Sequence, residues 1–168
     1  HSIKKVFKKS WLGYGSNVRE FENKFSKFIG TKYAVGLNSC TAALHLALAV
    51  NKFKKKKKVL IPAMTFSATA AAILYNDLIP VFVDVNKDDL NISFEDLKKK
   101  YTKDCVAVMA VHFGGNPCKM EKIVPWARSK KMIVIEDCAH TCGGVYKGKK
   151  LGAWGDYGCF SFEDKKVI

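Results

Sequence analysis

Short apolar runs recur along the middle of the chain and are separated by longer stretches with helical patterns. The runs are rich in β-branched side chains and cover residues 59–63, 81–85, 106–111 and 132–135. Continuous apolar runs of this kind are typical of strands covered on both faces, as in a parallel sheet. A further short run over residues 33–37 predicts one more strand, the first along the chain.

Helices are predicted between these runs. Residues 18–29 place three phenylalanines and Ile29 on one face, and Gly30 follows as the expected C-cap. Four further helices are predicted over residues 41–49, 67–75, 93–101 and 120–130. Pro125 either kinks the last of these or marks its true beginning. Alternation of strands and helices at this spacing predicts an α/β domain of three layers with a mostly parallel sheet.

The charge of the chain at first suggests a nucleic-acid-binding protein, because the formal net charge is +14. However, 27 of the 29 basic residues are lysines, and they are spread along the whole chain. Arginine is the residue that usually grips phosphates and base edges. The one lysine run, residues 54–58, fits a solvated loop before a strand. We therefore expect no nucleic-acid partner, and a basic binding module remains an alternative.

The cysteines and the apolar runs exclude several other classes. Six cysteines occur without a CxxC pair, so Cys138, His140 and Cys142 do not form a metal motif, and we expect no metal. Small buried thiols in a reducing cytoplasm are the favoured interpretation. No apolar run approaches the roughly 20 residues of a membrane span, and the first ten residues lack the apolar core of a signal peptide.

Residues suited to binding an anion and a planar ring follow the first two predicted strands. Residues 38–42 enter an apolar helix with small side chains, so their backbone N–H groups could form a phosphate cup. The alternative is ordinary helix capping by Ser39 or Thr41. Phe66 follows the next strand and could stack on a planar cofactor, or it could be a core phenylalanine.

Acidic and basic groups follow the later strands. Asp137 comes directly after an apolar run and could pair with a protonated ring nitrogen, or it could cap a helix. His140 lies three residues further on, near enough to reach the same ligand if the chain turns there, although for His140 alone a satisfied, partly buried histidine is the favoured interpretation. Near the end of the chain, Ser161 could bind phosphate and Lys166 could form an imine with an aldehyde. A phosphate cup, an aromatic ring, an acid and a lysine, in this order, are what pyridoxal 5′-phosphate (PLP) requires from a protein.

With these motifs the chain resembles the sugar-nucleotide aminotransferase family called DegT/DnrJ/EryC1/StrS, of PLP fold type I. The resemblance covers nearly the whole chain, in residues 15–30, 38–47, 61–69, 80–84, 111–114, 135–140 and 160–166. Two departures are visible. Cys40 stands where many relatives have glycine, and Glu163-Asp164 stands where many have His-Pro.

The resemblance implies a role for each candidate residue. Lys166 matches the lysine that carries the cofactor, and Asp137 matches the acid on the pyridine nitrogen. Phe66 matches the aromatic side chain that stacks on the ring, and His140 matches a polar neighbour of that ring. The positions that match phosphate contacts are Thr41, Ala42 and Ser161.

The resemblance also implies the organisation of the whole protein. We expect an N-terminal segment and helix over residues 1–30 and an incomplete PLP-binding large domain over residues 31–168, with the smaller C-terminal domain absent. The implied function is transfer of an amino group, typically from glutamate, to a nucleotide-linked keto-sugar. A homodimer located in the cytoplasm is expected, with no membrane partner.

Two alternatives remain at this point. One is a PLP-dependent sugar-nucleotide dehydratase on the same fold, and Lys166 speaks against it because such relatives typically have histidine at that position. The other is a truncated chain that keeps the fold without catalysing the reaction.

Overall fold

The structure is a computed structural model that describes residues 2–8 and 13–166. The chain divides into two compact units, residues 1–36 and 37–168. The first unit contains the helices α1 (Ser2–Lys8) and α2 (Ser16–Ile29). Gly30 ends α2 in the left-handed conformation, with φ of 84°, and its N–H donates to the carbonyl oxygen of Ser26 at 2.8 Å. The predicted C-cap at Gly30 is thus confirmed.

Residues 33–37, by contrast, form no strand, so that prediction was wrong. The backbone N–H of Gly36 donates to the Glu22 carboxylate at 2.7 Å, and the hydroxyl of Tyr14 donates to the other oxygen of the same carboxylate at 2.7 Å. The Gly36 donor is therefore used within the first unit and is not available to a neighbouring strand.

A five-stranded parallel sheet forms the centre of the second unit, in the order β2-β1-β3-β4-β7. Its strands are β1 (Lys58–Pro62), β2 (Ile79–Val83), β3 (Cys105–Val111), β4 (Ile133–Cys138) and β7 (Tyr157–Phe160). The first four agree with the apolar runs of the sequence to within a few residues. All side chains of β4 except Ile133 are buried, as expected of a strand covered on both faces.

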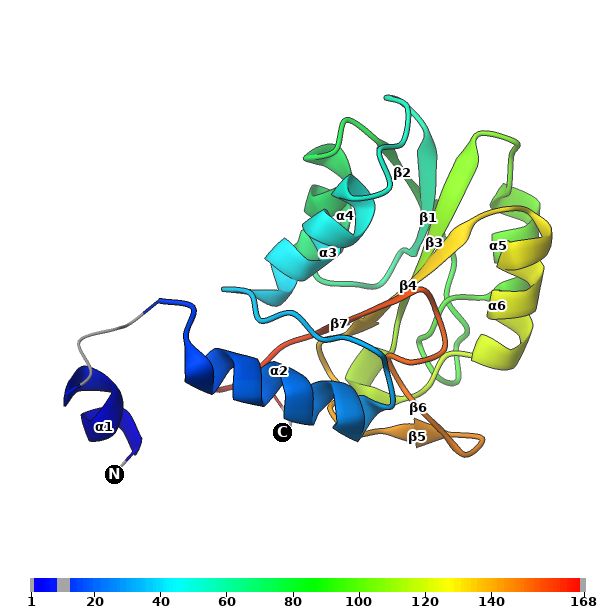
Figure 1. The fold of residues 1–168 in the computed structure, drawn as a ribbon. Helices are drawn as coiled ribbons and strands as arrows, with labels where there is room; N and C mark the ends of the chain where they lie inside the picture. Colours follow the sequence, from blue (N-terminus) through cyan, green and yellow to red (C-terminus); the bar gives the residue numbers. More distant parts are fainter. Residues whose placement is uncertain (1, 9–12, 167–168) are drawn as a thin grey trace. The chain divides into compact units, whose positions relative to one another are not determined.

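Two pairs of helices cover the two faces of this sheet (Figure 1). The first pair is α3 (Cys40–Ala49) and α4 (Ser67–Leu74), and the second is α5 (Phe94–Lys100) and α6 (Met120–Ser129), with a 3₁₀ turn, η1 (Phe113–Gly115), between α5 and α6. Successive residues of a strand point to opposite faces of the sheet, so they pack into two different hydrophobic cores. Ile135 packs with α3 and α4, whereas Val134 packs with α5 and α6. The predicted three-layer α/β/α architecture is confirmed.

The fifth strand of the sheet was not predicted. β7 is short and contains Gly158, so it lacks the β-branched run that marked the other strands. It follows a small antiparallel hairpin, β5 (Val145–Tyr146) and β6 (Lys149–Lys150), which was also not predicted. Lys147 and Gly148 form the hairpin turn with φ of 47° and 77°, the left-handed values that a tight two-residue turn requires.

Candidate active site

The carboxyl ends of the parallel strands lie at one edge of the sheet, where ligands of open α/β sheets bind. Each predicted cofactor residue of the second unit follows or lies near such an end. The set comprises Thr41 and Ala42 in the first turn of α3, Phe66 after β1, Asp137 and His140 at the end of β4, and Ser161 and Lys166 after β7. The topology thus gathers side chains that are distant in sequence.

Asp137 is buried at the end of β4 and faces the α3 and α4 layer. One carboxylate oxygen accepts a hydrogen bond from the hydroxyl of Thr69 at 3.3 Å, and the other accepts from the N–H of Ala139 at 3.1 Å. Burial raises the pKa of this carboxyl group above its ordinary value, and these two hydrogen bonds offset the shift in part. Among the described residues, no basic side chain forms an ion pair with Asp137.

Thr69 contacts Asp137, and Thr65 contacts Thr69; the sequence did not predict either contact. Thr69 is completely buried in α4, and its hydroxyl lies 2.7 Å from that of Thr65. A buried hydroxyl needs a partner, and Thr69 finds one in Asp137. The signal in the sequence was a threonine in the first turn of a largely apolar helix, where a buried hydroxyl must find a partner.

The first turn of α3 shows ordinary capping. The hydroxyl oxygen of Ser39 accepts a hydrogen bond from the N–H of Ala42 at 3.1 Å, so the capping alternative is observed here. In the part of the chain that the structure describes, no residue accepts from the N–H groups of Cys40 and Thr41. These two donors of the helix N-terminus therefore remain available to an anion.

Cys40 shows that three parts of the site lie within electrostatic range of one another. Burial, and then the charge of Asp137, raise the pKa of the Cys40 thiol to about 12, whereas the charge of Lys166 lowers it. The start of α3, the end of β4 and the segment after β7 therefore lie close enough for their charges to act on this thiol. With that pKa the thiol is neutral at pH 7, so it adds no charge to an anion site.

Phe66 and His140 occupy contrasting environments at the same edge of the sheet. Phe66 immediately precedes α4 and is 73% exposed, so the alternative that it is a core residue is wrong. His140 is half-buried, and its Nδ1 atom accepts a hydrogen bond from the N–H of Gly114 at 3.2 Å. Its ring packs edge-on against Phe113, with the ring centroids 5.7 Å apart.

The segment after β7 forms a tight turn. The hydroxyl oxygen of Ser161 accepts a long hydrogen bond, 3.5 Å, from the N–H of Glu163, and the N–H of Lys166 donates to the carbonyl oxygen of Glu163 at 2.9 Å. β7 pairs with β4 so that Cys159 lies opposite Asp137. Because of this register, the chain leaves the sheet at Ser161, next to the end of β4, and Lys166 follows five residues later.

Residues 1–168 match the sequence model of the DegT/DnrJ/EryC1/StrS aminotransferase family. The chain belongs to this family. The resemblance seen in the motifs is therefore confirmed, and the match extends over the N-terminal unit as well as the sheet.

Named relatives and solved structures of similar fold agree with this assignment. GDP-perosamine synthase of Escherichia coli O157:H7 is 39% identical over 160 residues, which are 95% of this chain and 44% of that protein. The aminotransferase from Psychrobacter cryohalolentis superimposes with a TM-score of 0.96 at 31% identity, over 99% of this chain and 42% of that chain. The chain thus spans less than half the length of the relatives that it matches.

A dehydratase also has the same fold. The structure of Escherichia coli GDP-4-keto-6-deoxy-D-mannose-3-dehydratase with bound hydrated PLP superimposes with a TM-score of 0.85 at 30% identity. The alignment covers 91% of this chain and 41% of that one. Similarity of fold therefore does not separate the two reaction types, and the site residues must do so.

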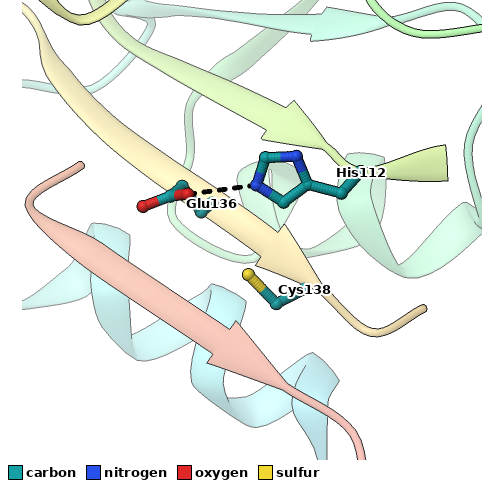
Figure 2. Close-up of side chains that lie close together, drawn as sticks. All are labelled: His112, Glu136 and Cys138. Carbon is teal, nitrogen blue, oxygen red and sulfur yellow. Dashed lines mark hydrogen bonds and ion pairs between the residues drawn. The ribbon is translucent and has the colours of Figure 1, made fainter. Parts of the chain in front are cut away.

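Beside Asp137, this family member carries a second buried carboxylate that the sequence analysis did not single out. Glu136 lies within 4.8 Å of His112 and Cys138, counted between their potential ligand atoms, and all three are buried (Figure 2). A charged residue inside an apolar strand was the available signal, because a buried charge must have partners. The metal motif that the sequence argued against, Cys138 to Cys142, contributes only Cys138 to this group.

No helix within residues 2–8 and 13–166 is long and apolar enough to cross a membrane.

Proposed function

We propose that the protein is a PLP-dependent aminotransferase that moves an amino group from a donor, with glutamate as the expected one, to a nucleotide-linked keto-sugar. Membership of the aminotransferase family supports the reaction type. The similarity to GDP-perosamine synthase supports a sugar nucleotide as the acceptor. Because the chain spans less than half of these relatives, the activity is proposed for the protein in its full length.

The observation that supports the proposal most strongly is the environment of the Asp137 carboxyl group. It is a buried carboxyl group with one hydrogen bond to each oxygen and no ion pair to a described residue. A buried carboxylate without a cationic partner is costly, so this position is suited to a ligand that brings a positive charge. The protonated pyridine nitrogen of PLP is such a group, and the site therefore fits the cofactor.

When bound, PLP supplies an aldehyde that a lysine amine can attach to and a ring that withdraws electrons from the substrate carbon. Asp137 would accept a hydrogen bond from the ring nitrogen and keep it protonated. Lys166 would hold the cofactor and, once released by the amino donor, would move the proton between the donor Cα and the C4′ atom of the cofactor. Both roles require only the side-chain chemistry that these residues possess.

The remaining residues would bind and orient the cofactor. Thr41, Ala42 and Ser161 would bind its phosphate, helped by the free N–H groups at the start of α3. The exposed ring of Phe66 would stack on the pyridine ring, and its exposure is what such a role requires before the ligand binds. His140 would lie beside the ring as its polar neighbour.

A dehydratase is the second candidate, because a dehydratase of this fold is among the similar structures. The residue that speaks against it is Lys166, since the resemblance places histidine at that position in dehydratases. Mass spectrometry of products from a nucleotide-linked keto-sugar and glutamate separates the two reactions. An aminotransferase replaces the keto oxygen by an amino group, whereas a dehydratase removes water from the sugar.

The decisive experiment is replacement of Lys166 in the full-length protein. We expect Lys166→Ala to abolish the visible absorbance of lysine-bound PLP, and Lys165→Ala, the neighbouring control, to retain it. Retention of the absorbance in Lys166→Ala would move the role to Lys165 or elsewhere and would contradict the proposed site. A homodimer is also proposed from the family resemblance, and light scattering during gel filtration measures it.

A further inference from the structure

Glu136 differs from the other acidic residues in the described part of the chain in the number of hydrogen bonds that it accepts while buried. Its Oε1 atom accepts from the N–H groups of Trp154 and Gly155, each at 2.7 Å. Its Oε2 atom accepts from the N–H of Gly152 at 2.9 Å and lies 3.0 Å from Nε2 of His112 (Figure 2). The side chains of Glu136 and His112 are both completely buried.

The partners of His112 determine which ring nitrogen carries its proton. The Nδ1 atom accepts a hydrogen bond from the N–H of Cys118 at 3.1 Å, so Nδ1 is unprotonated. The proton is then on Nε2, which donates to Glu136. The carboxylate thus has four donors, which fill its capacity as an acceptor. A metal ion could bind here only by displacing these bonds, so we interpret the group as a hydrogen-bonded anchor.

This anchor fixes the loop that leads into β7. The three backbone donors lie at residues 152–155, and β7 begins two residues later, at Tyr157. The next residue after the loop, Asp156, exchanges two bonds with Val134 of β4, each at 2.8 Å. The loop also lies close against the sheet, because a Cβ atom on Gly155 would stand 2.5 Å from the carbonyl oxygen of Val134. The loop therefore has little freedom to shift along β4.

The same anchor reaches the turn that contacts His140. His112 immediately precedes η1, and Gly114 within that turn donates its N–H to the Nδ1 atom of His140. Glu136 therefore connects two segments. Its bond to His112 reaches the turn η1, which contacts His140, and its three bonds to the loop reach the segment that leads to Ser161 and Lys166.

We propose that Glu136, together with His112, is a positioning residue of the active site. By fixing the loop at residues 152–155 on β4, the pair sets where β7 ends and therefore where Ser161 and Lys166 stand relative to Asp137. This placement matters only for the reaction proposed above, so the inference rests on the proposed function. Misplacement of a reacting group by about 1 Å can cost about a hundredfold in rate, so a rigid anchor is of consequence.

The first test is hydrogen–deuterium exchange of the PLP-free, full-length protein, with Glu136→Gln as the variant. The amide group of glutamine keeps the size of the side chain but replaces one acceptor oxygen by a donor, so at least one loop N–H loses its partner. We expect amides of residues 151–160 to exchange at least about tenfold faster. In the control Asp137→Asn, the neighbouring carboxylate is changed in the same way, and the exchange of this loop should stay at the wild-type rate.

The second test is the dissociation constant of PLP, measured well below the unfolding temperature. We expect Glu136→Gln to weaken PLP binding about tenfold or more. Leu97→Ala serves as a control for lost stability, because Leu97 is a buried core residue of α5 that makes none of the hydrogen bonds to Glu136 and lies outside the proposed site. It should destabilise the fold and leave PLP binding unchanged.

Variants of His112 provide a rescue experiment. His112→Gln keeps a donor that can reach Glu136, whereas His112→Leu removes it, so glutamine should retain more PLP affinity than leucine. The inference is overturned if Glu136→Gln leaves loop exchange and PLP affinity unchanged, or if Leu97→Ala weakens PLP binding as much as Glu136→Gln does. Failure of the proposed function has a different signature, since the wild-type protein itself would then lack the absorbance of PLP bound to Lys166.

Discussion

Two adjacent carboxylates on β4 have opposite environments, and the contrast separates what holds the fold from what meets a ligand. Glu136 faces the α5 and α6 layer and accepts bonds from three backbone N–H groups and His112. Asp137 faces the α3 and α4 layer and accepts two. Both are buried, so the number of donors, and not burial, distinguishes them.

The comparison shows that a saturated carboxylate and an unsaturated one serve different purposes. A carboxylate with all its acceptor capacity used has nothing left to offer a ligand, and its bonds instead connect segments of the chain. A buried carboxylate with few donors is costly until a cation arrives. We therefore propose that Asp137 meets the ligand and that Glu136 is the anchor.

The largest effect is expected from Asp137→Asn in the full-length protein with PLP. Removing one partner of a buried ion pair costs about 3–5 kcal/mol, which corresponds to a fall in kcat of between about a hundredfold and several thousandfold. Turnover of the keto-sugar measures this effect, and circular dichroism checks that the fold is intact. A kcat within a few fold of the wild-type value would assign the ring nitrogen to another residue.

A smaller effect is expected from Gly155→Ala, which changes the loop held by Glu136. The quantity affected is the free energy of unfolding. The added Cβ atom would lie 2.5 Å from the carbonyl oxygen of Val134, so the loop must move away from that part of β4. We expect the free energy of unfolding to fall by about 1–3 kcal/mol, as urea denaturation would measure. The matched control is Gly148→Ala in the hairpin turn, where no atom lies within 4 Å and only the left-handed φ of 77° opposes alanine. A Gly155→Ala protein as stable as the wild type would contradict the steric explanation, and Gly148→Ala gives the loss that a left-handed φ alone causes.

The smallest effect is expected in the pH dependence of the PLP-free protein. Because the pKa of Asp137 is raised in the folded state, that state binds a proton more tightly than the unfolded chain does. Stability should therefore fall as the pH rises from the unfolded pKa, near 3.8, through the raised folded pKa, by about 1.4 kcal/mol for each pH unit that separates the two pKa values. In Asp137→Asn this contribution should disappear from the stability measured by thermal unfolding at each pH. An unchanged pH profile would show that Asp137 is not the group responsible.

Much of the fold followed from local patterns in the sequence. Apolar β-branched runs identified β1 to β4, and apolar periodicity identified α2 and α6. Segments that are apolar nearly all round identified α3 and α4, and a capping signal identified α5. The strand predicted at residues 33–37 was wrong because a distant side chain, Glu22, takes a backbone donor there. β7 was missed because its glycine and short length leave no local pattern.

The candidate site was predicted less completely. The side chains at the strand ends, from Phe66 to Lys166, could be named because parallel strands bring their carboxyl ends to one edge. The exposure of Phe66, the bond from Thr69 to Asp137 and the cap from Ser39 to Ala42 required the packed structure. These features depend on which donors remain after the backbone has made its own bonds.

The sequence by itself thus determined the strands and helices with strong periodicity, the family, and the side chains with suitable chemistry. Only the tertiary structure decided that Glu136 would be saturated and Asp137 left open. In the sequence they are two adjacent acids, and strand alternation sends them to opposite faces. The donors that distinguish them come from residues 69, 112 and 152–155, which are far apart along the chain and meet only when the sheet forms.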